Sequence, residues 1–469
     1  MKLICVSGSS GVGKTTLSKL IESVIGVDKV VCLSGDDLHK WERDNCAWNT
    51  KTHLNPESNV LHVGHEHIVS LMNGESVLRV QYNHDTGKFD PPVKIEPKQC
   101  VLYEGLHALY HKPTSDLADV KIFVDTDTEL KTEWKIKRDT KKRGYTEDQV
   151  IDTMKRRIHD EELYITPQRK NADIIVKFTK DRMGSVCLEY VNITDVGSEL
   201  MSKVKDFYDS LNEFMGICKS LSLDPSLVQG RGGNVSIKSK SGLIIKASGS
   251  MMGDINLYHG FCVCHHSNGS VPSFDTDDEY NNYVTLSKKS GFGRPSMEMG
   301  FHDSIKERVI IHTHPIHLNV LLCSREGKPI INGLFKDLSY KFIEYQVPGR
   351  ELMNRIGDSK GILFLENHGL IVSAVNAKEA LSITNEINNR CKMWLGNHYE
   401  SFVDVSEDDT KINLPLFPDA AVFPVEMSST NNYILRLMTA ACLTPKFLNR
   451  NQIRHLNNMT SEKHRKTLV

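Results

Sequence analysis

This sequence of 469 residues contains no long apolar run. The first apolar stretch, Met1–Val6, ends at Ser7 and Gly8, which is too short for the apolar core of a secretory signal. No later stretch approaches the roughly 20 apolar residues of a membrane-spanning helix. We therefore expect no membrane partner and a cytoplasmic location.

An excess of one charge is also missing. The chain has 58 lysines and arginines against 59 aspartates and glutamates, a formal net charge of −1. Proteins that bind nucleic acid or anionic membranes attract them through a positive excess. The balance therefore argues against a nucleic-acid partner and favours a small-molecule substrate.

The cysteines lack the pattern of a disulfide framework. The eleven cysteines are scattered, and several, such as Cys5, Cys32 and Cys100, lie in apolar runs, which indicates reduced thiols. The segment Cys262–His266 has metal-ligand residue types. Its alternation equally suits a strand with both thiols on one face, and no second cysteine pair lies at zinc-finger spacing. We therefore predict a strand there.

Short apolar runs alternate with amphipathic stretches in the first half of the chain. We predict strands at Lys2–Ser7, Val30–Ser34, Cys100–Tyr103, Val120–Val124, Asp173–Phe178 and Ser185–Ile193, and helices at Thr15–Ile25, Thr128–Lys142 and Gly197–Cys218. Strands that are apolar throughout are covered on both faces. Alternation of such strands with helices is typical of an α/β fold with a parallel, doubly wound sheet.

The length predicts two or three domains, at roughly 100–200 residues each. From Leu221 onward, glycine-rich turns at Gly230–Gly233 and Ser248-Gly249 separate short strands. Beyond about residue 394, an acidic turn at Glu407–Asp409 precedes basic, helical sequence. We place the domains at 1–200, 207–395 and 396–469, the last as an extension of the second.

A phosphate-binding loop is predicted at the first strand–helix junction. The stretch Gly8-Ser9-Ser10-Gly11-Val12-Gly13-Lys14-Thr15 matches G-x-x-x-x-G-K-[ST] in full. Its backbone N–H groups and the helix N-terminus favour phosphate, Lys14 can reach the β- and γ-phosphates, and the Thr15 hydroxyl can bind Mg²⁺. We therefore expect these residues and Thr16 to bind ATP–Mg²⁺.

A kinase must also activate an acceptor hydroxyl. Asp36 and Asp37 lie at the C-terminal end of the predicted strand Val30–Ser34, where α/β sheets place ligands. Glu104 follows the strand Cys100–Tyr103 and can complete a magnesium shell. Carboxylates that cap nearby helices are the alternative interpretation.

These residues belong to a series of motifs that resembles the phosphoribulokinase/uridine kinase family over about residues 1–180. The matching stretches are Gly35–Lys40, Tyr82–Lys88, Tyr103–His107, Trp134–Asp139, Arg143–Tyr145 and Tyr164–Gln168.

The resemblance implies a role for each motif. Asp36 is the expected base toward the acceptor hydroxyl, and Glu104 is expected near Mg²⁺. Arg138 and Arg143 are expected on a lid, where with Lys14 they stabilise charge on the transferring phosphoryl group. Tyr82 and His84 are expected near the acceptor. The family acts on ribulose 5-phosphate or on a nucleoside, and the acceptor stays open between them.

A candidate metal site lies in the second domain. An apolar run, Val309–Ile311, leads into His312-Thr313-His314, and residues i and i+2 of a strand share a face, as two imidazole ligands must. His368 lies between apolar runs, and Glu298 and His302 stand at i, i+4 on a helix-like stretch. Strand histidines that face solvent are the alternative.

With Gly232–Ser236, Ala247–Gly249, Pro295–Glu298 and Asn367–Gly369, these residues resemble the class II aldolase/adducin family from about Ser222 to Asn389. The resemblance implies an α/β domain with a central, mainly antiparallel sheet. It implies that His312, His314 and His368 bind Zn²⁺, with Glu298 at the metal as catalytic acid/base. Asn234, Ser248, Gly249 and Ser296 would hold a substrate phosphate.

The resemblance also implies a symmetric homo-oligomer, a tetramer, with a tyrosine or another acid from a neighbouring subunit at each site. Tyr433 is a tyrosine in the C-terminal part of the chain. Met297 stands where several members have a second serine. Glutamate at 298 is the aldolase-like residue, since related epimerases carry aspartate and adducin-type relatives lack the histidines.

We therefore expect a bifunctional enzyme. One half phosphorylates a sugar or related small metabolite with ATP, and the other cleaves or forms a sugar phosphate by zinc-dependent aldol chemistry. Three alternatives remain at this point. The zinc half can be an epimerase or dehydratase, it can be a non-catalytic, adducin-like oligomerisation domain, or the P-loop domain can regulate the zinc site.

Overall fold

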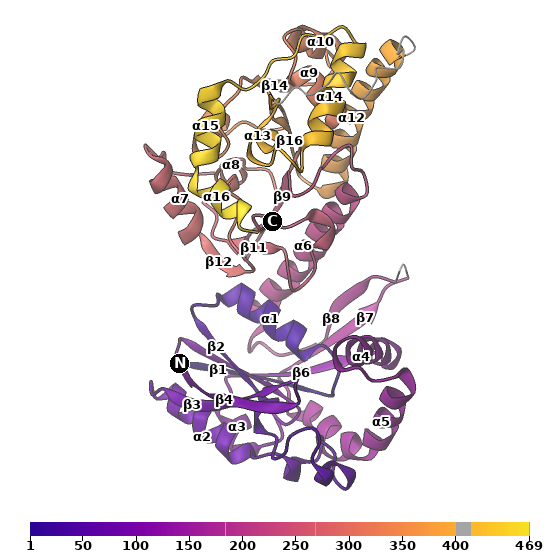
Figure 1. Ribbon diagram of the computed structural model, residues 1–469. Coiled ribbons are helices and arrows are strands. Elements are labelled where there is room, and N and C mark those ends of the chain that lie inside the picture. The colour runs from indigo at the N-terminus through magenta and orange to yellow at the C-terminus, as the bar shows by residue number, and fades with distance from the viewer. Residues whose placement is uncertain (183, 268, 400–413, 469) are drawn as a thin grey trace. The chain divides into compact units, whose positions relative to one another are not determined.

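The computed structural model describes residues 1–469 except 183, 268, 400–413 and 469 (Figure 1). The chain forms two compact units, Met1–Tyr208 and Asp209–Val469. The division falls inside helix α6 (Ser198–Ser222), the helix at which the sequence placed the domain boundary. The acidic turn expected at Glu407–Asp409 lies outside the described residues.

The first unit is built on a six-stranded sheet in the order β2-β5-β1-β6-β7-β8. Its strands are β1 (Lys2–Gly8), β2 (Val30–Ser34), β5 (Cys100–Gly105), β6 (Val120–Thr126), β7 (Ile174–Lys180) and β8 (Val186–Ile193). Neighbouring strands are parallel except β7 and β8, which are antiparallel. The predicted doubly wound α/β sheet is confirmed. A separate antiparallel ribbon joins β3 (Val77–Asn83) to β4 (Lys88–Ile95).

Helices cover both faces of this sheet (Figure 1). They are α1 (Lys14–Ile25), α2 (Leu61–Met72), α3 (Lys112–Leu117), α4 (Thr128–Arg143) and α5 (Glu147–Asp160). Leu3 and Cys5 of β1 pack in one core cluster with Ile68 and Leu71 of α2. The intervening residues Ile4 and Val6 are buried on the opposite face. Burial on both faces explains why the inner strands of this sheet are apolar throughout.

The second unit is built on an eight-stranded sheet in the order β12-β11-β10-β9-β13-β16-β15-β14. Its strands are β9 (Asn234–Ser239), β10 (Gly242–Lys246), β11 (Phe261–Cys264), β12 (Lys288–Gly291), β13 (Val309–Thr313), β14 (Tyr340–Ile343), β15 (Ile362–Leu365) and β16 (Gly369–Ala374). The pairs are antiparallel except β14 with β15, as expected. Cys262 and Cys264 lie in β11 with both thiols in the core, so the predicted strand is confirmed.

Ten helices that begin after α6 belong to the described part of this unit. They are α7 (Asp277–Leu286), α8 (Met299–Ser304), α9 (Ile316–Leu322), α10 (Gly327–Leu334), α11 (Arg350–Ile356), α12 (Ala377–Tyr399), α13 (Pro418–Val422), α14 (Ser428–Ala440), α15 (Arg450–Asn458) and α16 (Thr460–Lys466). The last four form the C-terminal segment, by which we mean residues 414–468. Its helices account for the basic, helical sequence expected there.

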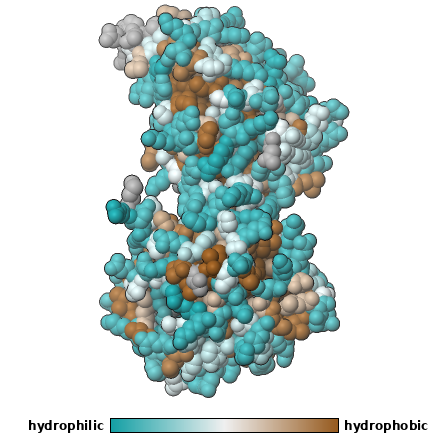
Figure 2. Space-filling view, turned by 180° about the vertical axis from the view of Figure 1, so that it is seen from behind, coloured by the Kyte–Doolittle hydropathy of each residue, from teal (hydrophilic) through white to brown (hydrophobic). Residues whose placement is uncertain are grey.

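The surface is mainly hydrophilic on the face shown in Figure 2, with apolar areas among the polar side chains. Leu223, Leu286, Val375 and Val425 are the most exposed large apolar residues described, at 71–88%. Such side chains can contact further chains, and the expected tetramer stays a prediction. Among the described residues, we find no helix with the length and apolar character to cross a membrane.

Candidate functional sites in the two units

The predicted phosphate loop connects β1 to α1. Gly11 and Gly13 have φ angles of 88° and 95°, which favour glycine. A Cβ atom on Gly13 would lie 2.8 Å from the Phe178 ring, so a larger residue would clash there. The Lys14 ammonium donates a hydrogen bond to the Ser9 carbonyl at 2.8 Å. The backbone of the loop therefore curves around Lys14, the lysine that is expected to bind the phosphates.

Glu104 lies directly beside this loop. Its carboxylate accepts hydrogen bonds from Thr15 Oγ1 at 3.1 Å and from Ser18 Oγ at 2.9 Å. Burial raises the pKa of Glu104, and the positive charge of Lys14 opposes the rise. The structure thus brings together the two residues predicted to hold Mg²⁺. It adds Ser18, which lies three residues after Thr15 and so on the same helix face.

Asp36 faces the same end of the sheet from the neighbouring strand. Ser34 at the end of β2 pairs with Glu104 at the end of β5, and Asp36 follows in the short 3₁₀ helix Gly35–Leu38. Burial alone would raise the pKa of Asp36. The hydrogen bond from His84 and the charge of Lys14 outweigh burial and hold the pKa below its ordinary value. Asp36 is therefore a carboxylate at neutral pH.

His84 connects Asp36 to the predicted lid. Its Nε2 lies 3.1 Å from Asp36 Oδ2, and its Nδ1 lies 3.1 Å from Arg143 Nη2. Because a guanidinium can only donate, Nδ1 must accept, and the ring proton sits on Nε2. His84 therefore donates to Asp36 while it accepts from Arg143.

Three cationic side chains of α4 lie within ion-pair distance of Asp139. Its carboxylate lies 2.8 Å from Arg138 Nε, 3.2 Å from Lys135 Nζ and 3.4 Å from Arg143 Nη1. Burial lowers the pKa of Lys135 to about 8. Among the described residues, no hydrogen-bond partner reaches the buried Nη2 atom of Arg138. That nitrogen is available to a phosphoryl oxygen.

Aromatic and imidazole rings form a wall next to Asp36. Trp48 stacks on His53 with ring centroids 3.7 Å apart, and the His39 ring meets the rings of His53 and Tyr82 edge-on at 4.8 and 5.1 Å. Burial lowers the pKa of His53 to about 2, so this ring is neutral. No role was predicted for the rings of His39, Trp48 and His53. His39 belongs to the matching stretch Gly35–Lys40, whereas Trp48 and His53 follow no regular spacing.

The buried His39 ring is the polar part of this wall. Its Nε2 lies 4.0 Å from Asp36 Oδ1, and neither ring nitrogen has a hydrogen-bond partner among the described residues. The wall therefore offers apolar ring faces together with one imidazole that can form a hydrogen bond with a polar group of a substrate.

Asp37 has a different environment from Asp36. It forms an ion pair with Arg79 at 3.0 Å and accepts a hydrogen bond from the Tyr82 backbone at 2.9 Å. The side chains of Asp37 and Arg79 are 10% and 2% exposed, whereas that of Asp36 is 36% exposed. Asp37 therefore holds the β3–β4 ribbon in place rather than facing the acceptor.

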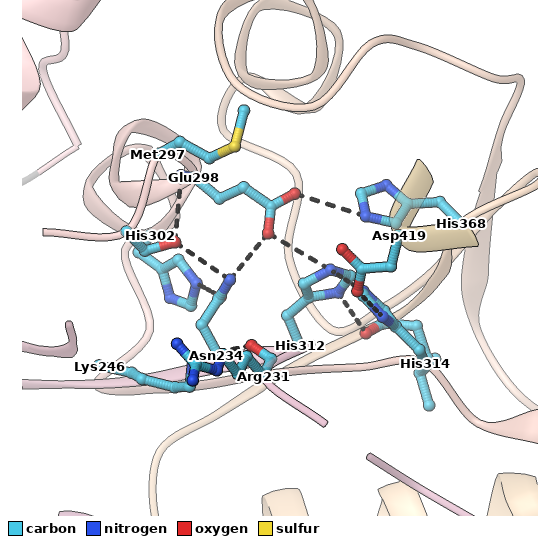
Figure 3. Close-up of polar contacts among 12 residues, drawn as sticks. Arg231, Asn234, Lys246, Met297, Glu298, His302, His312, His314, His368 and Asp419 are labelled. Atoms are coloured by element: carbon cyan, nitrogen blue, oxygen red, sulfur yellow. Dashed lines mark hydrogen bonds and ion pairs between the residues drawn. The ribbon is translucent and has the colours of Figure 1, made fainter. Parts of the chain in front are cut away.

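In the second unit, three predicted metal ligands come together. His312 lies in β13, His314 follows that strand, and His368 lies in the turn between β15 and β16 (Figure 3). One nitrogen atom from each ring lies within 4.8 Å of the others, and all three residues are buried. Burial lowers the pKa of His312 and of His368, so both rings are neutral and their lone pairs can bind a metal.

The hydrogen bonds of two of the rings fit a zinc ion. His312 Nδ1 lies 3.0 Å from the Leu370 carbonyl, and His314 Nδ1 lies 3.2 Å from Asp419 Oδ2, so in neutral rings both Nδ1 atoms donate. Both Nε2 atoms then carry lone pairs, and they are 3.1 Å apart. A cation relieves their repulsion. Tetrahedral zinc would space two such nitrogens about 3.4 Å apart.

Glu298 points between His312 and His368 (Figure 3). Its carboxylate oxygens lie 3.4 Å from His312 Nε2 and 3.6 Å from His368 Nε2. Asn234 donates to the same carboxylate at 2.7 Å, and the other end of its amide contacts His302. The arrangement fixes the orientation of a carboxylate beside the predicted metal ligands.

The predicted phosphate-binding residues line one pocket with these groups. Its lining comprises Arg231, Gly232, Gly233, Asn234, Lys246, Ser248, Gly249, Ser296, Met297, Glu298, His314, Pro348, His368, Pro418, Asp419, Glu462 and Arg465. Three cations of this pocket, Arg231, Lys246 and Arg465, were not predicted as site residues. Burial lowers the pKa of Lys246 to about 8. Its place directly before Ala247–Gly249 was the available signal.

Tyr433 does not line this pocket. It lies on α14 with 41% of its surface exposed. The C-terminal segment instead supplies Asp419, Glu462 and Arg465. No sequence signal joined these residues to the histidines, because charged residues in a basic helical segment usually face solvent.

Two family models match the chain. The model described as phosphoribulokinase/uridine kinase family matches residues 3–184, and that described as class II aldolase and adducin N-terminal domain matches residues 212–395.

Phosphoribulokinases and uridine kinases are among the curated proteins that match the chain. Phosphoribulokinase of Synechocystis is 35% identical over 181 residues, which cover 39% of this chain and 54% of that protein. Chloroplastic phosphoribulokinase of Spinacia oleracea is 31% identical over 194 residues and 48% of its length. The chain thus spans about half the length of these relatives. Uridine kinase of Staphylococcus aureus is 32% identical over 183 residues, which cover 37% of this chain and 86% of that protein.

Solved structures are similar at low TM-scores. The N-terminal class II aldolase domain of a protein from Thermoplasma acidophilum shares 23% identity at a TM-score of 0.35, over 39% of this chain and 93% of that one. Phosphoribulokinase from Rhodobacter spheroides shares 25% at 0.32, over 41% and 80%. The sequence matches carry the conclusion: this chain belongs to the phosphoribulokinase/uridine kinase family and joins to that kinase domain a class II aldolase and adducin domain.

Proposed function

We propose that the chain is a bifunctional enzyme that phosphorylates a hydroxyl group of a sugar or related small metabolite and cleaves or forms a sugar phosphate by aldol chemistry. One observation carries the proposal. A carboxylate base beside a phosphate loop and a buried three-histidine site with a cationic pocket occur in the same polypeptide.

In the kinase half, the residues divide the work between proton transfer and charge. Bound ATP–Mg²⁺ would supply the phosphoryl group and neutralise its oxygens. Asp36 accepts the proton of the acceptor hydroxyl through Oδ1, because His84 already occupies Oδ2. Lys14 and Arg138 stabilise the charge on the transferring group. The wall of His39, Trp48 and His53 holds the acceptor in place.

In the aldolase half, Glu298 is the acid/base that transfers the proton of the aldol step. Bound zinc would polarise the carbonyl of the substrate. Asn234 keeps the Glu298 carboxylate at the histidines. Lys246, Ser248 and Ser296 hold the phosphate, since a buried ammonium with one backbone partner gains a counter-ion there. The phosphate added by the first half is thus the group by which the second half recognises its substrate.

Mass spectrometry of a panel of ketoses, aldoses, alditols and nucleosides, incubated with ATP, Mg²⁺ and Zn²⁺, tests both halves. We expect one compound to gain a phosphoryl group, and its product to give two fragments. Lys14→Ala should abolish the first change, while His312→Ala should stop the reaction at the phosphorylated compound. A panel without any phosphorylated product contradicts the kinase assignment. A product of unchanged mass but changed retention would assign an epimerase.

A further inference from the structure

The C-terminal segment reaches the metal site although it lies beyond the residues that match the aldolase family. The family model ends at residue 395. Pro418, Asp419, Glu462 and Arg465 nevertheless line the pocket that contains Glu298, His314 and His368. This arrangement raises the question of what these additional residues do at the site.

Asp419 binds the imidazole of His314 directly. Its Oδ2 atom lies 3.2 Å from His314 Nδ1, and the carboxylate lies beside that ring in Figure 3. Its other oxygen, Oδ1, accepts a hydrogen bond from Arg465 at 3.0 Å. Each oxygen therefore has its own partner, which fixes the plane of the carboxylate.

Arg465 is itself held in place. One guanidinium nitrogen donates to both oxygens of Glu462, at 2.9 and 3.0 Å, and the group stacks over the Phe423 ring at 4.9 Å. The side chains of Arg465 and Glu462 are 13% and 2% exposed. A buried cation that is hydrogen-bonded to both Asp419 and Glu462 cannot move without losing these partners, so it holds Asp419 in place.

The Asp419 contact decides which nitrogen of His314 is free. A neutral imidazole that donates Nδ1–H to a carboxylate keeps its lone pair on Nε2, the atom that faces His312. In the other tautomer, a proton would occupy the position where the metal binds. His312 achieves the same through the Leu370 carbonyl, so the two rings are oriented by different parts of the chain.

Gly232 leaves the space that this contact needs. A Cβ atom at position 232 would lie 2.7 Å from Asp419 Oδ2 and 3.0 Å from His314 Nδ1. Any side chain there would push the carboxylate and the ring apart. The glycine-rich turn at Gly230–Gly233 therefore leaves the room that the contact between Asp419 and His314 requires.

A second tie joins the C-terminal segment to the loop of the third histidine. Asn367 precedes His368 and has a φ angle of 52°, rare for a residue with a side chain. Its amide donates to the carbonyls of Leu416 at 2.7 Å and Lys446 at 2.5 Å. The segment is thus attached beside two of the three histidines.

We propose that the C-terminal segment is part of the metal site, with Asp419 as a positioning residue that orients His314 and Arg465 as the group that fixes Asp419. Neither residue is a metal ligand. The inference rests on the proposed zinc binding by the three histidines. It assigns a role to residues that the family match does not cover.

The test is the zinc affinity of the full-length protein, measured by competition with a chelator. Asp419→Asn should weaken zinc binding about 10- to 100-fold. The single amide oxygen serves Arg465, so the NH₂ group turns to His314 Nδ1 and favours the tautomer that blocks the metal. Asp337→Asn is the matched control, because its exposed ion pair with Arg390 lies away from the pocket lining, and it should leave the affinity unchanged.

Gly232→Ala provides a second variant that keeps every charge. It should also weaken zinc binding, and it should change the visible absorption of the Co²⁺-loaded protein, which reports ligand geometry. Asp419→Asn should lower the melting temperature, because it weakens the buried contact with Arg465. Thermal unfolding of the metal-free variants should still show a cooperative transition above the assay temperature, so that the loss of affinity is measured on folded protein.

The outcomes separate this inference from the proposed function. If the wild-type protein takes up no stoichiometric zinc, the proposed metal site fails and the inference fails with it. If the wild type binds zinc and both variants bind it equally tightly, the positioning role is overturned while the metal site stands. A loss of affinity that Asp337→Asn reproduces also overturns it.

Discussion

Asp36 and Asp37 are adjacent carboxylates with different partners. Asp36 is more exposed and is hydrogen-bonded by His84, whereas Asp37 is buried against Arg79. Asp37 thus contributes to packing, whereas Asp36 is the proposed base. The two residues therefore allow a matched pair of substitutions.

Asp36→Asn should lower kcat for phosphoryl transfer about 10²- to 10⁴-fold, because the amide cannot accept the proton of the acceptor hydroxyl. Magnesium-dependent nucleotide binding, followed by calorimetry, should be unchanged. A variant with wild-type kcat would remove Asp36 from the role of base.

Asp37→Asn should instead destabilise the first unit by about 3 kcal/mol, because it leaves the buried Arg79 without its counter-ion. Urea unfolding followed by tryptophan fluorescence measures this, since Trp41, Trp48 and Trp134 belong to the first unit. Unfolding at wild-type urea concentrations would show that the ion pair contributes little.

A pH effect is expected from Glu462. Burial raises its pKa from 4.5 to about 7, against the opposing charge of Arg465. The folded state thus holds this proton more firmly than the unfolded state. The stabilisation is complete below pH 4.5 and is lost as the pH rises through 7.

Melting temperatures of the wild type and Glu462→Gln between pH 4.5 and 8, recorded without metal, test this. The wild-type melting temperature should fall relative to that of the variant as the pH rises. Parallel pH profiles would contradict a raised pKa.

The sequence predicted the residues of each site that follow a regular spacing. The loop Gly8–Thr15, the His312/His314 pair and Glu298 are of this kind, and the structure brings each set together. Asp419 and Arg465 could not be predicted, since more than 100 residues separate Asp419 from His314. Nothing in their local sequence marks their contact.

At the scale of elements, apolar runs predicted all six strands of the first sheet. Five of these strands are mostly buried, and burial on both faces makes a strand apolar throughout. The edge strand β8 is mostly at least partly exposed, and Leu188 alone is buried among its described residues. The β3–β4 ribbon was missed. Most of its residues are at least partly exposed, so its sequence carries no pattern of burial.

Replacing a glycine with alanine is expected to have opposite effects on stability in helix α6 and in the phosphate loop. Gly216 lies in α6, and nothing lies within 4 Å of a Cβ atom placed there, so Gly216→Ala should stabilise the protein by up to about 1 kcal/mol. Gly13→Ala should destabilise it and weaken nucleotide binding, because the added atom clashes with Phe178 in an unfavourable backbone conformation. Chemical denaturation and nucleotide titration of both variants measure these effects. Similar behaviour of the two would contradict the geometry.

For the whole molecule, we expect two sites that act independently, where the phosphorylated product of the first site is the substrate of the second. Lys14→Ala and His312→Ala proteins each lack one step, and a mixture of them should restore the two-step conversion of the sugar if the phosphorylated intermediate is released. The mass-spectrometric assay of the mixture measures this. A mixture that accumulates no fragments, although each half-reaction works, would indicate direct transfer of the intermediate.

The register of β2 and β5 has a consequence for how substrate preference can change. Ser34 pairs with Glu104, and a Cβ atom on Gly35 would lie 2.9 Å from the Gly105 backbone. The pairing of the two strands therefore sets where Asp36, the proposed base, and Glu104, the proposed magnesium ligand, leave the sheet. His39, Trp48 and His53 lie outside those strands. Redesign of that wall should therefore change which alcohol the proposed kinase site accepts, while the sheet keeps the spacing of Asp36 and Glu104 unchanged.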